Sequence, residues 1–229
     1  MRKLMLSSIV SFALVSSIAH ADTKQSVGVN LGSIGGDIEY TRMVMPEYNL
    51  ALRVGIGGFS YSGEYDDTDT HYETDLSQFN IGATIEYHPF ASGFYIGAGI
   101  YYQNPSYEME ATPSGGEYEF NGHLYPAELI GSVNGKVEGL NKVAPYIGIG
   151  YDASLFDDDT WFFTFKAGAW YQDNPIVSLT AHDCALDRLS EGSCDQLRYD
   201  LDQEEDDINE DLEDYKWWPV LQVGVTYRF

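Results

Sequence analysis

The C-terminal residues 217–229 alternate between apolar and polar side chains with the two-residue period of a β-strand. The apolar face carries Leu221, Val223, Val225, Tyr227 and Phe229. The opposite face carries Gln222, Gly224, Thr226 and Arg228. Because the strand ends on an aromatic residue and its other face is small, polar or charged, we predict that the apolar face contacts lipid. Tyr227 and Phe229 would mark the membrane-inserted end of this strand.

Nine earlier segments repeat the alternation. They are residues 26–32, 37–44, 50–57, 78–88, 94–103, 123–139, 145–152, 161–172 and 176–180. The total is ten strands, or eight if the first two segments are joined across Gly35-Gly36 and the short ninth segment is joined to the eighth. Both counts are even, as closed bacterial barrels require. The predicted fold class is therefore all-β: a closed antiparallel transmembrane β-barrel of eight or ten strands.

Polar and acidic stretches separate some of these strands, and short turns separate others. Residues 63–75 and about 105–122 are predicted to be long solvent-facing loops, whereas residues 45–49 and 89–93 are predicted to be tight turns. This alternation of turns and acidic loops favours turns at the periplasmic end and loops outside. Glycines on the inner faces would leave room in a narrow lumen for the aromatic and charged residues beside them.

The N-terminus has the composition of a secretory signal peptide. Arg2 and Lys3 precede an apolar run from Leu4 to Ile18, and Ala19-His20-Ala21 forms a small-x-small cleavage site. A transmembrane helix would need about 20 apolar residues, and five serines interrupt this run. We therefore predict that residues 1–21 are cleaved and that residues 22–229 form one barrel domain.

The charge of the chain limits its partners. With 36 acidic and 12 basic residues, the net charge is −24. Without Arg2 and Lys3, 10 basic residues face 36 acidic ones, a net charge of −26. Such a chain will not bind nucleic acid by charge, and we expect cationic partners such as small basic solutes or divalent ions.

Residues 182–214 interrupt the barrel pattern. Cys184 and Cys194 are the only cysteines, and in an exported protein they favour a loop-closing disulfide over a metal site. Leucines and an isoleucine then recur at nearly helical spacing among acidic residues. We predict a disulfide-closed loop that leads into a short acidic helix, inserted between two strands.

The second half of the chain resembles a known family. The resemblance is carried by residues 135–137, 143–150, 168–180, 215–220 and 223–225, which include Ala144-Pro145-Tyr146-Ile147-Gly148 and Ala169-Trp170-Tyr171-Gln172. These segments are similar in order and spacing to the CarO-type ornithine uptake porin family of small outer-membrane β-barrels. The cysteine loop departs from that pattern.

The resemblance implies eight strands, the outer membrane of a Gram-negative bacterium, and uptake of a basic amino acid. Outer-membrane lipid, lipopolysaccharide and the barrel-assembly machinery, which would engage the C-terminal strand, are the partners that follow from it.

Six charged residues are predicted to face the lumen: Glu39, Arg53, Glu86, Asp152, Lys166 and Arg228. Two interpretations of these charges are compatible with each other. Pairing across a narrow interior would hold the barrel together, because an unpaired buried charge is costly. A polar path would use the acidic members to attract a cationic solute.

The sequence offers few candidate residues for cofactor binding or catalysis. The acidic run 200–214 lacks the ligand spacing and central glycine of a calcium loop, so we predict no metal site and no cofactor. His71, near Asp69 and Glu73, is the best candidate for an acid–base group, but a hydrolase is the least favoured function. We predict a non-enzymatic, narrow porin or uptake channel for small cationic solutes. The alternative is a closed structural or surface-interaction barrel.

Overall fold

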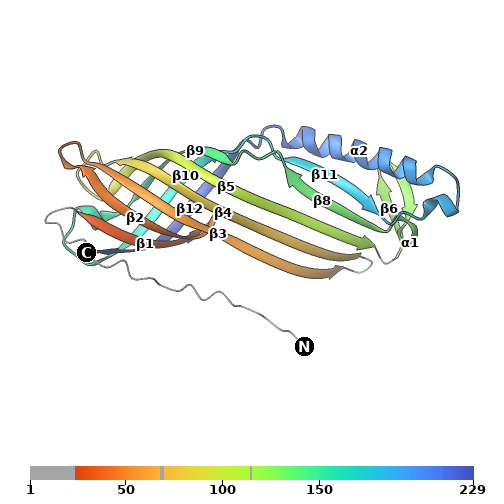
Figure 1. Ribbon diagram of the computed structural model, residues 1–229, viewed down its shortest axis with the longest axis horizontal. Coiled ribbons are helices and arrows are strands. Elements are labelled where there is room, and N and C mark those ends of the chain that lie inside the picture. Colours follow the sequence, from red (N-terminus) through yellow and green to blue (C-terminus); the bar gives the residue numbers. More distant parts are fainter. Residues whose placement is uncertain (1–23, 68–69, 114) are drawn as a thin grey trace, which may run out of the picture.

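The chain folds into a closed barrel that continues into a sheet at one end. The computed structural model describes residues 24–67, 70–113 and 115–229, so the predicted signal peptide at residues 1–21 lies outside the described residues. Eight antiparallel strands form the ring (Figure 1): β1 (Gln25–Gly32), β2 (Gly35–Met45), β3 (Leu50–Asp67), β4 (Thr70–Tyr87), β5 (Phe94–Pro113), β9 (Val143–Tyr151), β10 (Trp161–Tyr171) and β12 (Trp217–Arg228).

Pairing of the first and last strands closes this ring. Val27 of β1 lies opposite Tyr227 of β12, and β5 pairs with β9 to join the two halves of the sheet. The predicted closed barrel of eight strands is confirmed.

The fusions that produced the count of eight were wrong. β1 and β2 are separate strands joined by a turn, in which Gly35 has φ +90° and a side chain would overlap the Gly58 carbonyl. Two of the ten predicted segments lie outside the ring: residues 123–139, which contain β8 (Ser132–Glu138), and residues 176–180, which belong to β11 (Ile176–His182). β8 and β11 pair with each other.

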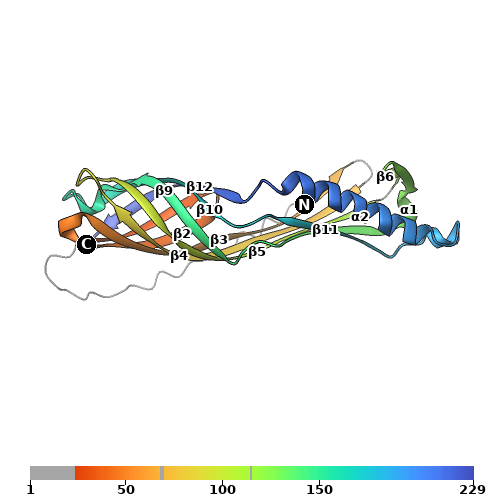
Figure 2. The ribbon, with the colours of Figure 1, turned by 90° about the horizontal axis from the view of Figure 1, so that it is seen from above.

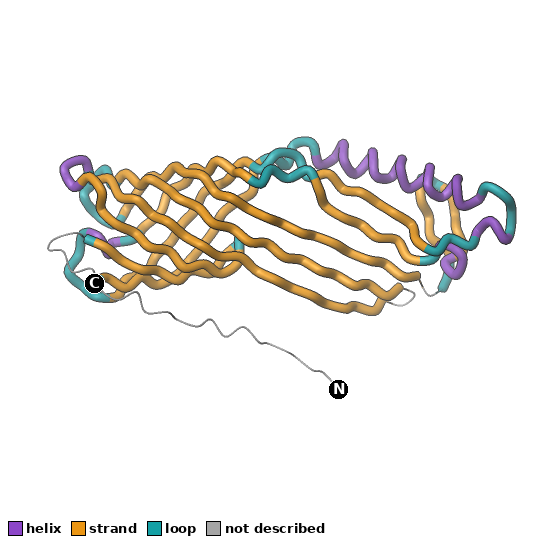
Figure 3. The backbone as a smooth tube through the Cα atoms, in the orientation of Figure 1, coloured by secondary structure: helices purple, strands orange, loops and turns teal. Residues whose placement is uncertain are grey.

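Three barrel strands extend well beyond the ring. β5 pairs with β9 as far as Tyr102 and with β8 from Tyr107, and β3 and β4 stay paired up to Asp67 and Thr70. The predicted loops at residues 63–75 and 105–122 are therefore mostly strand. We call the parts of β3 after Gly58, of β4 before Phe79 and of β5 after Tyr102, together with β8 and β11, the sheet extension. Figure 3 shows it as a long arm of strands.

A helix runs along one edge of the sheet extension. This helix, α2 (Ser193–Leu212), packs along β11, as Figures 1 and 2 show, and the Cys184–Cys194 disulfide ties its first turn to the loop that follows β11. Beside it lie the hairpin of β6 (Glu117–Phe120) and β7 (His123–Pro126) and the short helix α1 (Ala127–Ile130). These elements share a small core of Tyr125, Ile130, Leu186, Cys194, Leu197 and Leu201. None of the described helices is long and apolar enough to cross a membrane.

The opposite end of the barrel carries the C-terminus and the short connections. They include two 3-10 turns, η1 (Pro46–Tyr48) and η2 (Ala153–Leu155); a third, η3 (Leu186–Arg188), lies near α2. We call this end of the barrel the turn end. It lies away from α2 in Figures 1 and 2.

The outer wall of the ring is apolar between two aromatic belts. Exposed aliphatic and aromatic side chains line it, among them Ile56, Ile81, Ile100, Ile149, Phe163, Phe165 and Val223. At the turn end Trp161 contacts Tyr227, and towards the sheet extension Tyr171 contacts Trp217. The eleven residues of β10 join the two belts, which matches the roughly 9–11 that a tilted strand needs to cross a membrane.

Candidate functional site: the charged interior of the barrel

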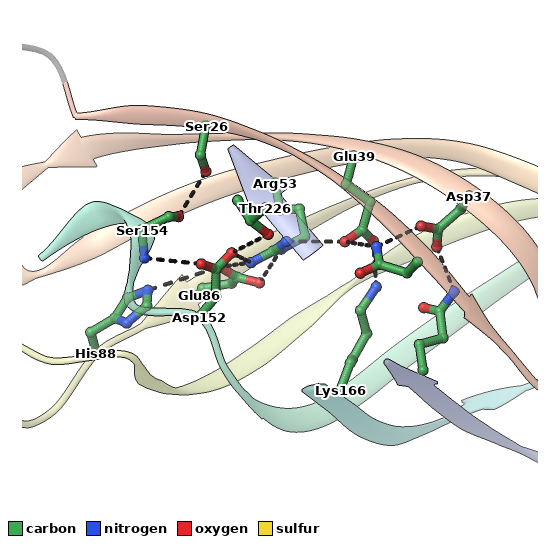
Figure 4. Close-up of polar contacts among 12 residues, drawn as sticks. Ser26, Asp37, Glu39, Arg53, Glu86, His88, Asp152, Ser154, Lys166 and Thr226 are labelled. Carbon is green, nitrogen blue, oxygen red and sulfur yellow. Dashed lines mark hydrogen bonds and ion pairs between the residues drawn. The ribbon is translucent and has the colours of Figure 1, made fainter. Parts of the chain in front are cut away.

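Arg53 is the centre of the barrel interior. Its Nε donates to Glu86 Oε1 at 2.6 Å, and its Nη1 donates to Glu39 Oε2 at 3.0 Å. Its Nη2 donates to Asp152 Oδ2 at 3.0 Å (Figure 4). These four side chains come from β3, β4, β2 and the residue after β9, and none is more than 2% exposed. One guanidinium therefore joins three carboxylates across the lumen, the bidentate and multidentate geometry that suits arginine.

The network continues towards the sheet extension. Lys166 on β10 donates to Glu39 Oε1, and Asn30 Nδ2 donates to Glu39 Oε2 at 3.0 Å. Asn30 also donates to Asp37 at 2.6 Å, and Gln222 Nε2 donates to the other Asp37 oxygen at 2.6 Å. Each carboxylate is thus held by side-chain donors from other strands, which compensates for its removal from water.

The turn end of the lumen is closed. Ser154 in η2 donates its backbone N–H to Asp152 Oδ1 at 3.0 Å, and its hydroxyl lies 2.9 Å from that of Ser26. Leu155 packs with Met43 and Ala51 in a buried cluster at the same end. The buried His88 lies beside Glu86, with its Nδ1 2.9 Å from the Ser92 carbonyl oxygen. The η2 turn therefore folds into the barrel mouth and fills it.

An aromatic layer closes the lumen on the other side of the charges. Tyr101 contacts both Tyr146 and Trp170, with ring centroids 5.5 and 5.4 Å apart. Ile34, from the β1–β2 turn, and Val220 complete this buried cluster. The charged network therefore lies between two packed layers.

Glycines on the inner wall make room for the rings. A side chain at Gly82 would overlap the ring of Tyr101, and one at Gly150 would overlap the ring of Tyr95. The tyrosines thus lie against the backbone of neighbouring strands, as the sequence predicted for inner-face glycines.

Five of the six predicted lumen residues come together in this network, and Arg228 does not. Arg228 is 23% exposed at the turn end, where it contacts the Asp157 carbonyl oxygen and Asp158 Oδ1. Sequence analysis missed Asp37, Asn30 and Gln222 as members of the network. All three lie on the inner face that the alternation predicts. Their position was therefore predictable from the sequence, whereas their bonding partners were not.

A further buried carboxylate, outside the barrel interior, lies on α2 itself. Asp200 accepts hydrogen bonds from Tyr125, Asn121 and Gln196, and its Oδ2 lies 2.9 Å from His123 Nδ1. Burial alone would raise the pKa of Asp200, but these hydrogen bonds and His123 hold it below the ordinary value.

The histidine singled out in the sequence lies on the sheet extension. His71 Nδ1 lies 2.6 Å from Asp66 Oδ1, and Nε2 lies 3.5 Å from Glu73. The hydrogen bond to Asp66 raises the pKa of His71. Among the described residues, no serine or cysteine is seen bonded to this imidazole or to that of His123.

Comparison with known proteins gives matches among solved structures. No protein-family model and no curated protein matches this sequence. The structure of CarO2 from Acinetobacter baumannii is 25% identical, with a TM-score of 0.59 over 91% of this chain and all of the other. CarO from the same organism is 23% identical, with a TM-score of 0.59 over 89% of this chain and 97% of the other. The fold is that of a CarO-type outer-membrane β-barrel.

A CarO-type barrel resides in the outer membrane, and so does this chain. The apolar wall and the two aromatic belts are the surfaces that such a protein presents to lipid. The predicted Cys184–Cys194 disulfide is also confirmed.

Proposed function

We propose that this protein is a closed outer-membrane barrel that acts through its sheet extension at the cell surface, without a standing path for solutes. The observation that carries this proposal is the position of the Arg53 network, sealed between the aromatic layer and the η2 turn. Long, elaborated connections lie on the outer side of bacterial barrels, so the sheet extension and α2 would face the medium.

The width of the ring supports a closed interior. Eight strands enclose a lumen that side chains can fill. Here the inner side chains Glu39, Glu86, Tyr101 and Trp170 are all buried, and every carboxylate of the network is already bonded. A solute would have to break these bonds and displace the aromatic layer before it could cross.

Uptake of small cationic solutes is the second candidate. It is favoured by the composition of the network, in which four carboxylates (Asp37, Glu39, Glu86 and Asp152) face two cations (Arg53 and Lys166). A basic amino acid would exchange with these resident cations during a transient opening. The resemblance to the CarO-type ornithine uptake porin family, which implies uptake of a basic amino acid, supports this alternative.

The remaining expectations are part of the same proposal. The protein would contact outer-membrane lipid and lipopolysaccharide through its wall, and the barrel-assembly machinery through β12. Its net charge disfavours nucleic acid. We propose a non-enzymatic role, because neither His71 nor His123 is seen with a nucleophile in the described structure.

Uptake into proteoliposomes tests the closed barrel. The refolded protein would be compared with empty liposomes for entry of ornithine, lysine, glutamate and glucose. We expect no solute to enter faster than into empty liposomes. Faster entry of ornithine and lysine, lost in a Glu39→Gln, Glu86→Gln variant, would instead establish the uptake channel.

A further inference from the structure

The sheet extension has an unpaired edge along β3. β2 pairs with β3 only as far as Gly36 opposite Gly58, whereas β4 accompanies β3 up to Asp67. Residues 59–66 therefore have a neighbouring strand on one side, and no described strand lies on the other. In an antiparallel ladder about half of the backbone amides and carbonyls point away from the partner. This edge offers them to a further strand.

The opposite edge of the sheet extension, on β11, is blocked by α2. Asn209 accepts from the Val177 N–H at 2.8 Å and donates to the Val177 carbonyl oxygen at 3.0 Å. Glu205 accepts from the Leu179 N–H at 2.9 Å. Two helix side chains thus replace a neighbouring strand on β11, the kind of cover that prevents unwanted pairing. Within the described residues no side chain does the same for residues 59–66.

The two faces beside the β3 edge differ in chemistry. Tyr61 and Tyr65 lie on the face that continues the lumen wall, and they are 59% and 65% exposed. Glu64 and Asp66 lie on the other face, opposite Glu73 and His71 of β4, and Asp66 Oδ1 lies 2.6 Å from His71 Nδ1. A strand added here would meet rings on one side and carboxylates on the other.

We propose that residues 59–66 of β3 accept an extended cationic segment of another protein as an added β-strand. Its lysines or arginines would alternate towards Glu64 and Asp66, and its apolar residues would lie against Tyr61 and Tyr65. Main-chain hydrogen bonds would supply affinity and the alternating side chains specificity. A second copy of this chain fits less well, because its own acidic strand would face these carboxylates. The inference rests on the proposed surface role and gives it a partner.

Hydrogen exchange with a defined peptide tests this proposal. The probe is a nine-residue peptide of alternating lysine and valine, capped at both ends and added to the full-length mature protein in phosphatidylcholine vesicles. A peptide with proline in place of valine keeps the charge but favours polyproline II, whose three-residue period does not match the two-residue period of the ladder. Versions N-methylated at every lysine or every valine block one hydrogen-bonding edge each.

The expected result is slower exchange confined to residues 59–66. The proline peptide should give no protection, and one of the two N-methylated peptides should fail. A Glu64→Gln, Asp66→Asn variant should bind the lysine–valine peptide about tenfold more weakly. The matched control, Asp206→Asn, Asp207→Asn on the exposed face of α2, should bind it within about twofold.

Two results would overturn the proposal. Equal binding of the proline peptide, without protection of residues 59–66, would mean non-specific adhesion by charge. Protection of this edge without peptide, growing with protein concentration, would assign it to a second copy of the chain. Neither result depends on solute uptake, so failure here is distinguishable from failure of the closed barrel.

Discussion

Arg53 determines the energetics of the barrel interior. Its guanidinium compensates three buried carboxylates, and Lys166 compensates only Glu39. Removing one partner from such a network leaves the others as unpaired buried charges, which is more costly than never having buried them.

Replacing this guanidinium should destabilise the barrel strongly. Arg53→Met should lower the free energy of unfolding by about 3–5 kcal/mol, because Glu39, Glu86 and Asp152 would lose their shared cation. Urea unfolding in lipid vesicles, followed by tryptophan fluorescence, measures the change. Arg228→Met, at the partly exposed turn end, is the control and should cost under about 1 kcal/mol. Equal effects of the two substitutions would contradict a central role for Arg53.

The glycines beneath the interior rings should also tolerate substitution poorly where a ring lies against them. Gly82→Ala should destabilise the barrel by about 1–3 kcal/mol, because the added methyl group would displace the Tyr101 ring and disturb the aromatic layer. In Gly97→Ala the new Cβ would lie 3.7 Å from Tyr95, an ordinary contact, so little change is expected. The same urea measurement compares them, and a harmless Gly82→Ala would show that the ring can move freely.

The residue alternation located the charged network but not its pattern of bonds. Glu39, Arg53, Glu86, Asp152 and Lys166 were all assigned to the lumen from their parity along the strands. Parity cannot show which strands become neighbours, so the bonds from Asn30 and Gln222 to Asp37 were not predictable. Arg228 has the predicted parity but lies at the rim, where it contacts Asp158 and not the network.

At the scale of elements, Asp200 joins α2 to the β6–β7 hairpin. The carboxylate accepts from Tyr125 of β7 and Asn121 of the connecting turn, while Gln196 on its own helix orients it. Because these contacts favour the ionised form, they should bind the hairpin only while Asp200 is charged.

This contact should depend on pH in a defined direction. The pKa of Asp200 is lower in the folded chain than its ordinary value of 3.8, so its stabilising contribution is complete above that value. The contribution is lost as the pH falls through the folded pKa. Hydrogen exchange of residues 117–126 in Asp200→Asn should be faster than in the wild type at pH 6 and equal to it at the lowest pH. Asp195→Asn, at an exposed helix position, should match the wild type throughout. A difference between Asp200→Asn and wild type that is independent of pH would contradict this account.

Element boundaries were predictable inside the membrane and not outside it. Within the wall, lipid on one side and side chains on the other enforce strict alternation, and the predicted ring strands were found there. Beyond the wall both faces of β3, β4 and β5 are partly or fully exposed, so polar residues such as Ser62 and Glu64 resemble a loop in the sequence. The predicted helix in residues 182–214 corresponds to α2. The disulfide that ties it to the preceding loop was predictable because the chain has only two cysteines.

At the scale of the whole molecule, an eight-stranded barrel continues into the sheet extension. The ring is anchored by an apolar wall with aromatic belts, and its interior is filled by paired charges between two packed layers. In the sheet extension, side chains of α2 block the edge at β11, whereas no described strand covers the edge at residues 59–66 of β3. In the proposed function, stability and surface recognition belong to different ends of one continuous sheet.

Single-channel recording in planar lipid bilayers tests the closed lumen most directly. The account predicts no conductance steps from the wild-type protein in potassium chloride, because the Arg53 network and the aromatic layer leave no continuous water path. Stable steps with cation selectivity that falls in Glu39→Gln would contradict it, and would show that the interior opens as a pore.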